Sequence, residues 1–354
     1  MSAEARANFP TDLDFYQVSI GRLIEFAEFE GNSLIMFDSL QTALTQKPDL
    51  IAPLIGRSVQ IAQEKLDQDR TQNCAVILPF ETALRMVAYQ EQPDLLYPSR
   101  WNPKLVIDWL TKKGNEVAEL AGVKTIGRNL PSRATWMVSV LDQAGVFNQT
   151  PFFIELGAAA GFILDSLKNP ARFRWWLQST NIPSNDAINN FTCTRTFDGF
   201  GVDLTPINDT IWAVACLGDD EAMDNLVNFL EKFPQRSKIL AGDIANDSVW
   251  EITSKTIVEA ARVGKTPVII ASEMLYLLSP DKREKVLGNI QSLIKKTNGY
   301  FLRSDSGQNL GLDVCPPELE MLTIGELRNP DFQLTGPRLG LFTKYSARWE
   351  KLTI

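Results

Sequence analysis

Residues 152–167 read FFIELGAAAGFILDSL, and the way this stretch bends decides how the rest of the chain is interpreted. An apolar run ends around Glu155, a Gly-Ala-Ala-Ala-Gly segment spans 157–161, and apolar residues at helical spacing follow. This pattern predicts a buried strand that turns tightly into a helix. Glycine permits such a turn, and it also lets a ligand approach the backbone beside the free N–H groups of the helix. The segment alone fits both a ligand site and a plain structural turn.

Beyond this stretch, short apolar segments alternate with amphipathic ones. The expected strands are 152–156, 199–204, 237–243, 266–272 and 299–305, and the expected helices are 219–233, 247–263 and 279–297. Alternation of this kind predicts parallel strands with crossover helices, hence an α/β fold with a doubly wound, mostly parallel Rossmann-like sheet. The final segment, 332–354, is expected to form two strands joined by a turn at Gly336–Pro337, which would close the sheet as an antiparallel hairpin.

Residues 1–128 are expected to be helical throughout. Apolar residues recur at three- and four-residue spacing in 19–29, 34–44, 50–66 and 105–122. We therefore divide the chain into a helical N-terminal region, 1–128, and a Rossmann-like domain, 129–354, with an insertion at 170–198. The helical region is expected to cover a cleft, to shape a substrate pocket or to form a homodimer interface, although apolar helical stripes more often pack into a core.

Composition excludes several classes of function. The 354 residues include 35 Lys and Arg against 43 Asp and Glu, so a net charge of −8 argues against a nucleic-acid partner. There is no histidine, which excludes a Ser-His-Asp triad, a Cys-His pair and an HExxH zinc site. The four cysteines, Cys74, Cys193, Cys216 and Cys315, contain no CxxC pair. No metal is expected, and the thiols are expected to be reduced, as in a cytoplasmic protein.

Neither a membrane segment nor a leader is expected. The longest apolar stretch, 267–278, has about a dozen residues where roughly 20 are needed to span a bilayer. The first residues, MSAEARANFPTDLD, contain no apolar run of the kind a signal peptide requires.

Acidic residues follow the predicted strands, at the edge where open parallel sheets bind ligands. The second strand ends at Asp203 and Leu204, where a carboxylate can accept hydrogen bonds from ribose hydroxyls. The third ends at Asp243 beside Ile244, a pair suited to an adenine amino group and ring face. The fourth ends at Ser272, with Glu273 and Tyr276 following, which places all three at the mouth of the cleft and makes Ser272 a candidate cofactor contact. Each carboxylate could instead cap a helix or lie in a solvated loop.

These segments carry a resemblance. IELGAAAG (154–161), GVDLTP (201–206), AGDI (241–244) and VIIASEMLYLL (268–278) resemble the ordered motifs of class I S-adenosylmethionine-dependent methyltransferases. The expected terminal hairpin is similar to that superfamily's reversed last strand. More narrowly, IELGAAAGF, GFGVDLTPIN and CLGDDEAMDN resemble a little-characterised bacterial family with a methyltransferase-like domain. The resemblance covers roughly residues 125–354.

The resemblance implies S-adenosyl-L-methionine as the cofactor. It assigns the methionine half to the turn that contains Glu155, Gly157, Ala159 and Gly161. It assigns the ribose to Asp203 and the adenine to Asp243 with Ile244. Arg133, in NLPSRATW before the first strand, becomes a candidate partner of the cofactor carboxylate, and a role in stabilising the fold is equally compatible with its position.

Two features depart from the superfamily pattern. Ala159 stands where many nucleotide-binding turns have glycine, and about 40 residues separate Gly161 from Asp203 where roughly 20 is usual for the related dinucleotide fold. The insertion carries ARFRWWLQSTNIP, an aromatic and basic segment that would form a cap or substrate wall, or simply pack Trp175 and Trp176 under a loop.

Methyl transfer from a sulfonium is an in-line displacement that depends on alignment and exclusion of water. Without histidine, Glu273 or Tyr276 is the expected base, and a carboxylate acceptor would need none. The sequence thus predicts O-methylation of a carboxylate or hydroxyl on a small molecule or peptide. Two alternatives remain: an NAD(P)-dependent oxidoreductase, and an inactive methyltransferase fold that only binds a partner.

Overall fold

A computed structural model describes residues 13–27, 33–66, 76–124, 126, 131–180, 186–272, 274–275, 278–306, 320–325, 338–343 and 346–351. The chain divides into two compact units. The helical unit contains Met1–Arg128 and Ile207–Glu231, and the sheet unit contains Asn129–Pro206 and Lys232–Ile354. The chain therefore passes between the units after 128, 206 and 231. Residues 207–231, which the sequence placed in the C-terminal domain, group with the helical unit.

All described elements before residue 128 are helical, which confirms the prediction for this region. The helical unit contains α2 (Leu13–Ala27), α3 (Ser33–Gln46), α4 (Pro48–Leu66), α5 (Ile77–Tyr89), η3 (Pro93–Leu96), η4 (Pro98–Arg100), α6 (Pro103–Val123), α11 (Thr210–Ala215) and α12 (Asp220–Lys232). α6 begins where the Asn102 side chain accepts the Leu105 N–H, with Pro103 at the first helical position. It packs tightly on α4, since a Cβ at Gly114 would lie 2.4 Å from Leu54 Cδ1.

A buried arginine joins α11 to the N-terminal helices. Arg85 is fully buried, and its guanidinium contacts both carboxylate oxygens of Glu81, at 2.5 and 3.1 Å. It also donates to the carbonyl of Leu96 at 2.8 Å and to that of Ala215 at 2.5 Å. A buried charge is costly without partners, and these four bonds supply them. The one to Ala215 links α11 to α5 within the helical unit.

The sheet unit is built on five parallel strands in the order β3-β2-β1-β4-β5. Their bounds are Pro151–Leu156 (β1), Asp198–Asp203 (β2), Ile239–Ala241 (β3), Thr266–Ser272 (β4) and Tyr300–Ser306 (β5). The predicted α/β class with a parallel sheet is therefore confirmed. Every residue of β1 is buried, as expected for a central strand covered on both faces.

Three further strands follow at the β5 edge: β6 (Glu320–Gly325), β7 (Arg338–Thr343) and β8 (Ser346–Lys351). Each pairs with its neighbour in antiparallel register. β7 begins after Gly336–Pro337 and pairs with β8 across residues 344–345. The predicted Gly/Pro turn, which lies outside the described residues, is thus not the connection between these paired strands.

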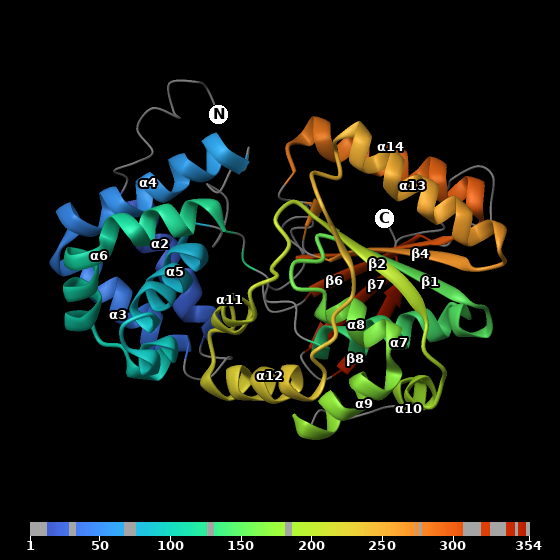
Figure 1. Cartoon of the computed structure of the whole chain (residues 1–354), viewed down its shortest axis with the longest axis horizontal. Helices are drawn as coiled ribbons and strands as arrows, with labels where there is room; N and C mark the ends of the chain where they lie inside the picture. Colours follow the sequence, from blue (N-terminus) through green and yellow to red (C-terminus); the bar gives the residue numbers. More distant parts are fainter. Residues whose placement is uncertain are drawn as a thin grey trace. The chain divides into compact units, whose positions relative to one another are not determined.

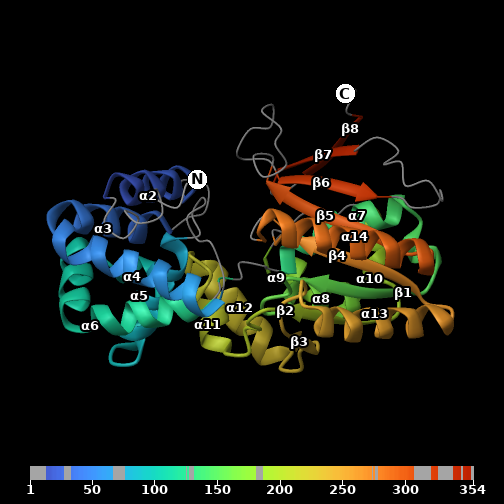
Figure 2. The same cartoon turned by 90° about the horizontal axis from the view of Figure 1, so that it is seen from above.

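Helices cover both faces of the parallel sheet (Figures 1 and 2). One face carries α13 (Asp247–Arg262) and α14 (Pro280–Thr297), and the other carries η5 (Pro131–Arg133), α7 (Ala134–Gln143), η6 (Val146–Asn148), α8 (Phe162–Lys168), α9 (Pro170–Ser179) and α10 (Asp186–Thr192). Side chains of β1 alternate between the two cores, with Phe153 on the α8 face and Ile154 on the α13 face.

The insertion at 170–198 belongs to the core layer. Phe173 and Phe191 are buried with α7 and α8, and Trp176 is 2% exposed. Trp175 is half-buried, with its ring edge-on to Phe233 at 5.8 Å between centroids. Plain packing accounts for Phe173 and Trp176. A cap or substrate wall formed by the rest of the segment stays a prediction. Within the described part of the chain, no helix combines the length and apolar character needed to cross a membrane.

Candidate functional site

The turn after β1 has an unusual backbone. Gly157, Ala159 and Gly161 all have positive φ, at 71°, 46° and 75°. The left-handed region suits glycine but strains alanine by about 1–2 kcal/mol. The N–H groups of Gly157 and Ala158 donate to the carbonyl of Val202 at 2.8 and 3.2 Å, so the end of β2 anchors the turn.

Asp203 supplies a second anchor. One carboxylate oxygen accepts the Ala159 N–H at 2.7 Å, and the other accepts the Thr205 N–H at 2.8 Å. Burial raises the pKa of Asp203, while these two backbone hydrogen bonds act in the opposite direction. The predicted ribose ligand is therefore also the group that holds the strained alanine. Each carboxylate oxygen keeps one acceptor position beyond these bonds, and Leu204 follows, half-buried.

Glu155 is fully buried beneath α8. Its Oε2 accepts the Leu164 N–H at 3.1 Å, and its Oε1 has no partner among the described residues. Burial raises the pKa of Glu155 well above its ordinary value; the nearby Asp165 and Asp203 add to this effect, and the charge of Arg133 opposes it. Glu155 is consequently a carboxyl that holds its proton more tightly than usual.

Ser272, the last residue of β4, is 3% exposed, and its hydroxyl has no partner in the described structure. Glu155 pairs in register with Ile270, whose side chain lies in the α8-face core. Because strand residues alternate between faces, Ser272 projects on the same face, two residues further along the neighbouring strand. The carboxyl ends of β1 and β4 thus present two buried, unpartnered polar oxygens on one face of the sheet.

Two residues that sequence reasoning missed support the turn from α8 and from the segment before β3. Arg236 donates to the carbonyl of Ala160 and lies over the Phe162 ring, 4.6 Å from its centroid. Its Nη1 is buried without a partner among the described residues. Asp165 accepts the Ser237 N–H at 2.7 Å. No motif marks either residue, because their role depends on contacts between segments about 70 residues apart in the chain.

Packing within the protein explains why residue 157 is a glycine. A Cβ on Gly157 would lie 2.6 Å from Met274 Cβ, so Met274, two residues beyond the end of β4, occupies the space that a side chain would take. A Cβ on Gly201 in β2 would lie 2.6 Å from Ala158 Cβ. Close packing between strand ends therefore explains these glycines without a ligand.

Asp243 and Ile244, which follow β3, already have contacts within the protein. Asp243 accepts the Ala245 N–H at 2.9 Å and forms an ion pair with Lys282 at 3.1 Å. Ile244 is 5% exposed and packs into the α13 and α14 core. In the described structure Asp243 has a turn-forming role and Ile244 has a core role. Their contact with an adenine ring stays a prediction.

The remaining predicted residues lie partly outside the described chain. Glu273 and Tyr276, the expected bases, fall there, so their roles stay predictions. Arg133 ends η5 and is half-buried, close enough for its charge to act on Glu155. Of the described cysteines, Cys216 is buried and Cys193 is exposed.

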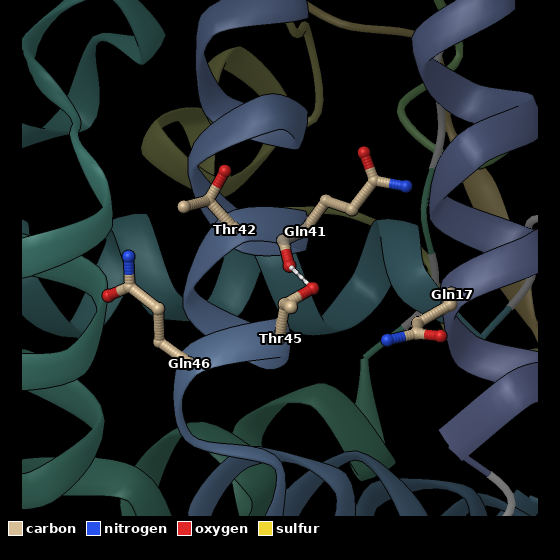
Figure 3. Close-up of a pocket in the computed structure, with 5 residues that line it drawn as sticks. All are labelled: Gln17, Gln41, Thr42, Thr45 and Gln46. Atoms are coloured by element: carbon tan, nitrogen blue, oxygen red, sulfur yellow. Dashed lines mark hydrogen bonds between the residues drawn. The ribbon is translucent and has the colours of Figure 1, made fainter.

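Two shallow pockets lie on the helical unit. One, of 440 Å³, is lined by Gln17, Gln41, Thr42, Thr45 and Gln46 from α2 and α3 (Figure 3). The Thr45 hydroxyl in it donates to the Gln41 backbone carbonyl at 3.0 Å. The other, of 510 Å³, lies between α4 and α6 beside Glu119. The first offers only amides and hydroxyls, so neither acid–base catalysis nor charge recognition is available in it.

The candidate site at the ends of β1, β2 and β4 therefore combines the left-handed turn 157–161, the anchored carboxylate of Asp203 and the unpartnered buried oxygens of Glu155 and Ser272.

Comparison of the chain with models of known protein families gives no match, and comparison with curated proteins gives none.

Proposed function

We propose that this protein is an S-adenosylmethionine-dependent methyltransferase whose cofactor binds at the carboxyl ends of β1, β2 and β4. The observation that carries the proposal is the convergence of the 157–161 turn, Asp203 and the unpartnered oxygens of Glu155 and Ser272 at one sheet edge. Open parallel sheets bind ligands at this edge. Buried polar atoms normally have partners, so two unpartnered oxygens fit a ligand that brings hydrogen-bond donors.

The residues present fit the methionine and ribose parts of this cofactor. Arg133 would attract the carboxylate of the methionine moiety, and Glu155 would face its ammonium group. Asp203 would accept hydrogen bonds from the ribose hydroxyls with the acceptor positions that Ala159 and Thr205 leave unused. Asp243 and Ile244 have other contacts, so the adenine contact assigned to them adds no support.

The cofactor, when bound, supplies an electrophilic methyl group. The chain would align the acceptor and exclude water, which suits an in-line displacement. We propose O-methylation of a carboxylate or hydroxyl on a small molecule or peptide, in the cytoplasm, with Glu273 or Tyr276 as base where one is required.

The first test is isothermal titration calorimetry of S-adenosylhomocysteine and, separately, NADH with the intact protein. Micromolar binding of the first without the second would support the proposal. Absence of S-adenosylhomocysteine binding would remove its basis. NADH binding alone would then favour an oxidoreductase, and no binding of either would favour a protein that acts through a macromolecular partner.

A variant locates the binding site. Asp203→Asn should weaken S-adenosylhomocysteine binding at least tenfold, because it removes the charge that accepts the ribose hydroxyls. Asp209→Asn is a matched control, because Asp209 also accepts two backbone N–H groups, at the start of α11. It should lose stability without losing affinity. Equal affinity losses in both variants would place the ligand elsewhere.

A further inference from the structure

The pocket between α2 and α3 is built from uncharged polar side chains. It has a volume of 440 Å³ and is lined by Gln17 of α2 and by Gln41, Thr42, Thr45 and Gln46 of α3 (Figure 3). We call it the glutamine–threonine pocket. Its α3 residues form two pairs four residues apart, so the members of each pair lie one above the other on the helix. The volume is within the range of sites that bind small molecules, about 300–1,000 Å³.

The hydrogen-bonding capacity of this pocket is largely unused within the protein. The carboxamides of Gln17, Gln41 and Gln46 make no hydrogen bond to the other described residues. The Thr45 hydroxyl donates to the Gln41 backbone carbonyl at 3.0 Å, and its oxygen can still accept. Each carboxamide has an acceptor oxygen and an NH₂ group that donates. The pocket therefore presents donors and acceptors together, without a charge.

A glycine keeps the α2 side of the pocket open. Gly21 lies one helical turn after Gln17, and a Cβ there would lie 3.8 Å from Gln41 Nε2. Figure 3 shows the Gln41 side chain extending toward the helix that carries Gln17. Glycine is unfavourable inside a helix, so a larger residue would be expected if packing alone determined this position. Its absence leaves space beside the Gln41 carboxamide.

The lining selects among classes of ligand. A charged ligand would lose hydration without gaining an opposite charge, because no lining residue is charged. An extended peptide requires a groove with pockets for alternate side chains, and the lining here offers no apolar side chain. Neighbouring hydroxyl groups, each of which both donates and accepts, match the carboxamides and hydroxyls of the pocket.

We infer that the glutamine–threonine pocket binds a neutral sugar, either a mono- or a disaccharide. The carboxamides of Gln17, Gln41 and Gln46 bond its hydroxyls, and Thr45 accepts from one of them. All the lining residues belong to the helical unit, so this site is independent of the proposed methyltransferase site at the strand ends of the sheet unit. The contacts are few and open to water, which gives a dissociation constant on the order of 1 mM.

Nuclear magnetic resonance of the glutamine side chains tests this inference. The full chain, labelled with ¹⁵N in its glutamine carboxamides, is titrated with glucose, galactose, mannose, maltose and trehalose, each to about 20 mM. We expect the side-chain signals of Gln17, Gln41 and Gln46, identified by single substitution, to shift together and saturably with at least one of these sugars. Glucuronate, a charged sugar, should bind at least about fivefold more weakly than glucose.

Two variants and a control locate the binding. Gln41→Ala removes a carboxamide, and Gly21→Leu fills the space beside it; each should weaken sugar binding about tenfold. Leucine is a better helix former than glycine, so the loss in Gly21→Leu does not come from unfolding of α2. Gln60→Ala is the matched control, because Gln60 is an exposed glutamine on α4 that donates to Glu64 at 2.9 Å. It should bind as the wild type does.

The opposite results are equally clear. Unchanged glutamine signals with every sugar would overturn the inference, as would equal sugar binding by Gly21→Leu and the wild type. Shifts caused by N-acetylglycine methylamide but by no sugar would show that the pocket binds peptide backbone, and would also overturn it. Because no step uses S-adenosylhomocysteine, none of these outcomes depends on the proposed function.

Discussion

Replacement of Asp203 by alanine tests how the turn after β1 is held. The carboxylate accepts the N–H groups of Ala159 and Thr205 at 2.7 and 2.8 Å. Ala159 has a φ of 46°, in a region that L-residues other than Asn, Asp and Gly seldom occupy. Asp203 therefore does two things in the ligand-free protein: it satisfies two backbone donors and it restrains a strained residue.

The expected cost follows from these contacts. A hydrogen bond to a charged group contributes about 1.5–3 kcal/mol, so two contribute about 3–6 kcal/mol before the burial of the carboxylate is considered. Burial offsets part of this, as the raised pKa of Asp203 indicates. We expect Asp203→Ala to destabilise the sheet unit by about 3 kcal/mol at pH 7.

Ala159→Gly provides the matching half of a double-mutant cycle. Glycine adopts positive φ without the steric cost, so this change should stabilise the wild-type protein by about 1 kcal/mol. In the Asp203→Ala background the turn can relax, and the same change should have almost no effect. The coupling free energy between the two positions should be about 1 kcal/mol.

Hydrogen exchange by mass spectrometry is the assay, because it reports each segment separately. Peptides covering 152–167 should lose protection in Asp203→Ala, while peptides covering α6 in the helical unit serve as the internal control. The reasoning is refuted if Asp203→Ala costs less than about 1 kcal/mol with unchanged exchange at the turn. It is equally refuted if Ala159→Gly gives the same gain in both backgrounds.

Arg85→Met leaves the Glu81 carboxylate buried without its partner, so it should lower the free energy of unfolding by about 3–5 kcal/mol, measured by urea unfolding. Hydrogen exchange should rise first in α11, which loses its bond from Arg85. The double variant Glu81→Leu/Arg85→Met should regain part of the lost stability. In thermal melts without ligand, the contribution of Glu155 to stability should be complete below pH 4.5, the ordinary pKa of a glutamate. It should decline as the pH rises toward the raised pKa that Glu155 has in the folded protein, and Glu155→Gln should remove that decline. Gly161→Ala should cost about 2 kcal/mol and Gly264→Ala about 1 kcal/mol, since both have positive φ but only the first has a neighbour near the new Cβ, at 3.2 Å.

The parallel sheet was predictable because its strands are apolar runs buried on both faces. β4 was expected at 266–272 and spans Thr266–Ser272, and β1 was expected one residue later than its start at Pro151. β3 was expected over seven residues but spans only Ile239–Ala241, where its side chains are half-exposed or exposed. Apolar pattern thus located the interior strands well and overextended the edge strand of the parallel group.

The sequence does not predict which of the two units residues 207–231 belong to. The pattern of α12 shows that one face is buried, and its residues Met223 and Leu226 are indeed in a core. A pattern does not say which core. That is decided by long-range contacts such as the Arg85 bond to Ala215 across 130 residues, which no local signal encodes.

Motifs located the strand ends of the candidate site but did not show which role each acidic residue has there. Asp203 and Asp243 occupy similar positions after β2 and β3, yet one anchors the strained turn and the other pairs with Lys282. Residue type and spacing are the same for a carboxylate that binds a ligand and for one that caps its own backbone. Only hydrogen-bond partners distinguish the two.

The hydrogen bonds of the turn therefore sharpen where a ligand can act. The N–H groups of Gly157 and Ala158 are satisfied by Val202, that of Ala159 is satisfied by Asp203, and Met274 fills the space beside Gly157. A turn satisfied in this way stays formed without a cofactor and gains little from direct contact with one. The unpartnered buried oxygens among the described residues are Glu155 Oε1 and Ser272 Oγ, and Arg236 Nη1 is an unpartnered donor beside the turn. If a ligand stabilises this protein, the increment should come from Glu155 Oε1, Ser272 Oγ and the acceptor positions that Asp203 keeps unused. Substitutions at Glu155 and Ser272 should therefore change ligand-induced stabilisation more than the stability of the ligand-free protein.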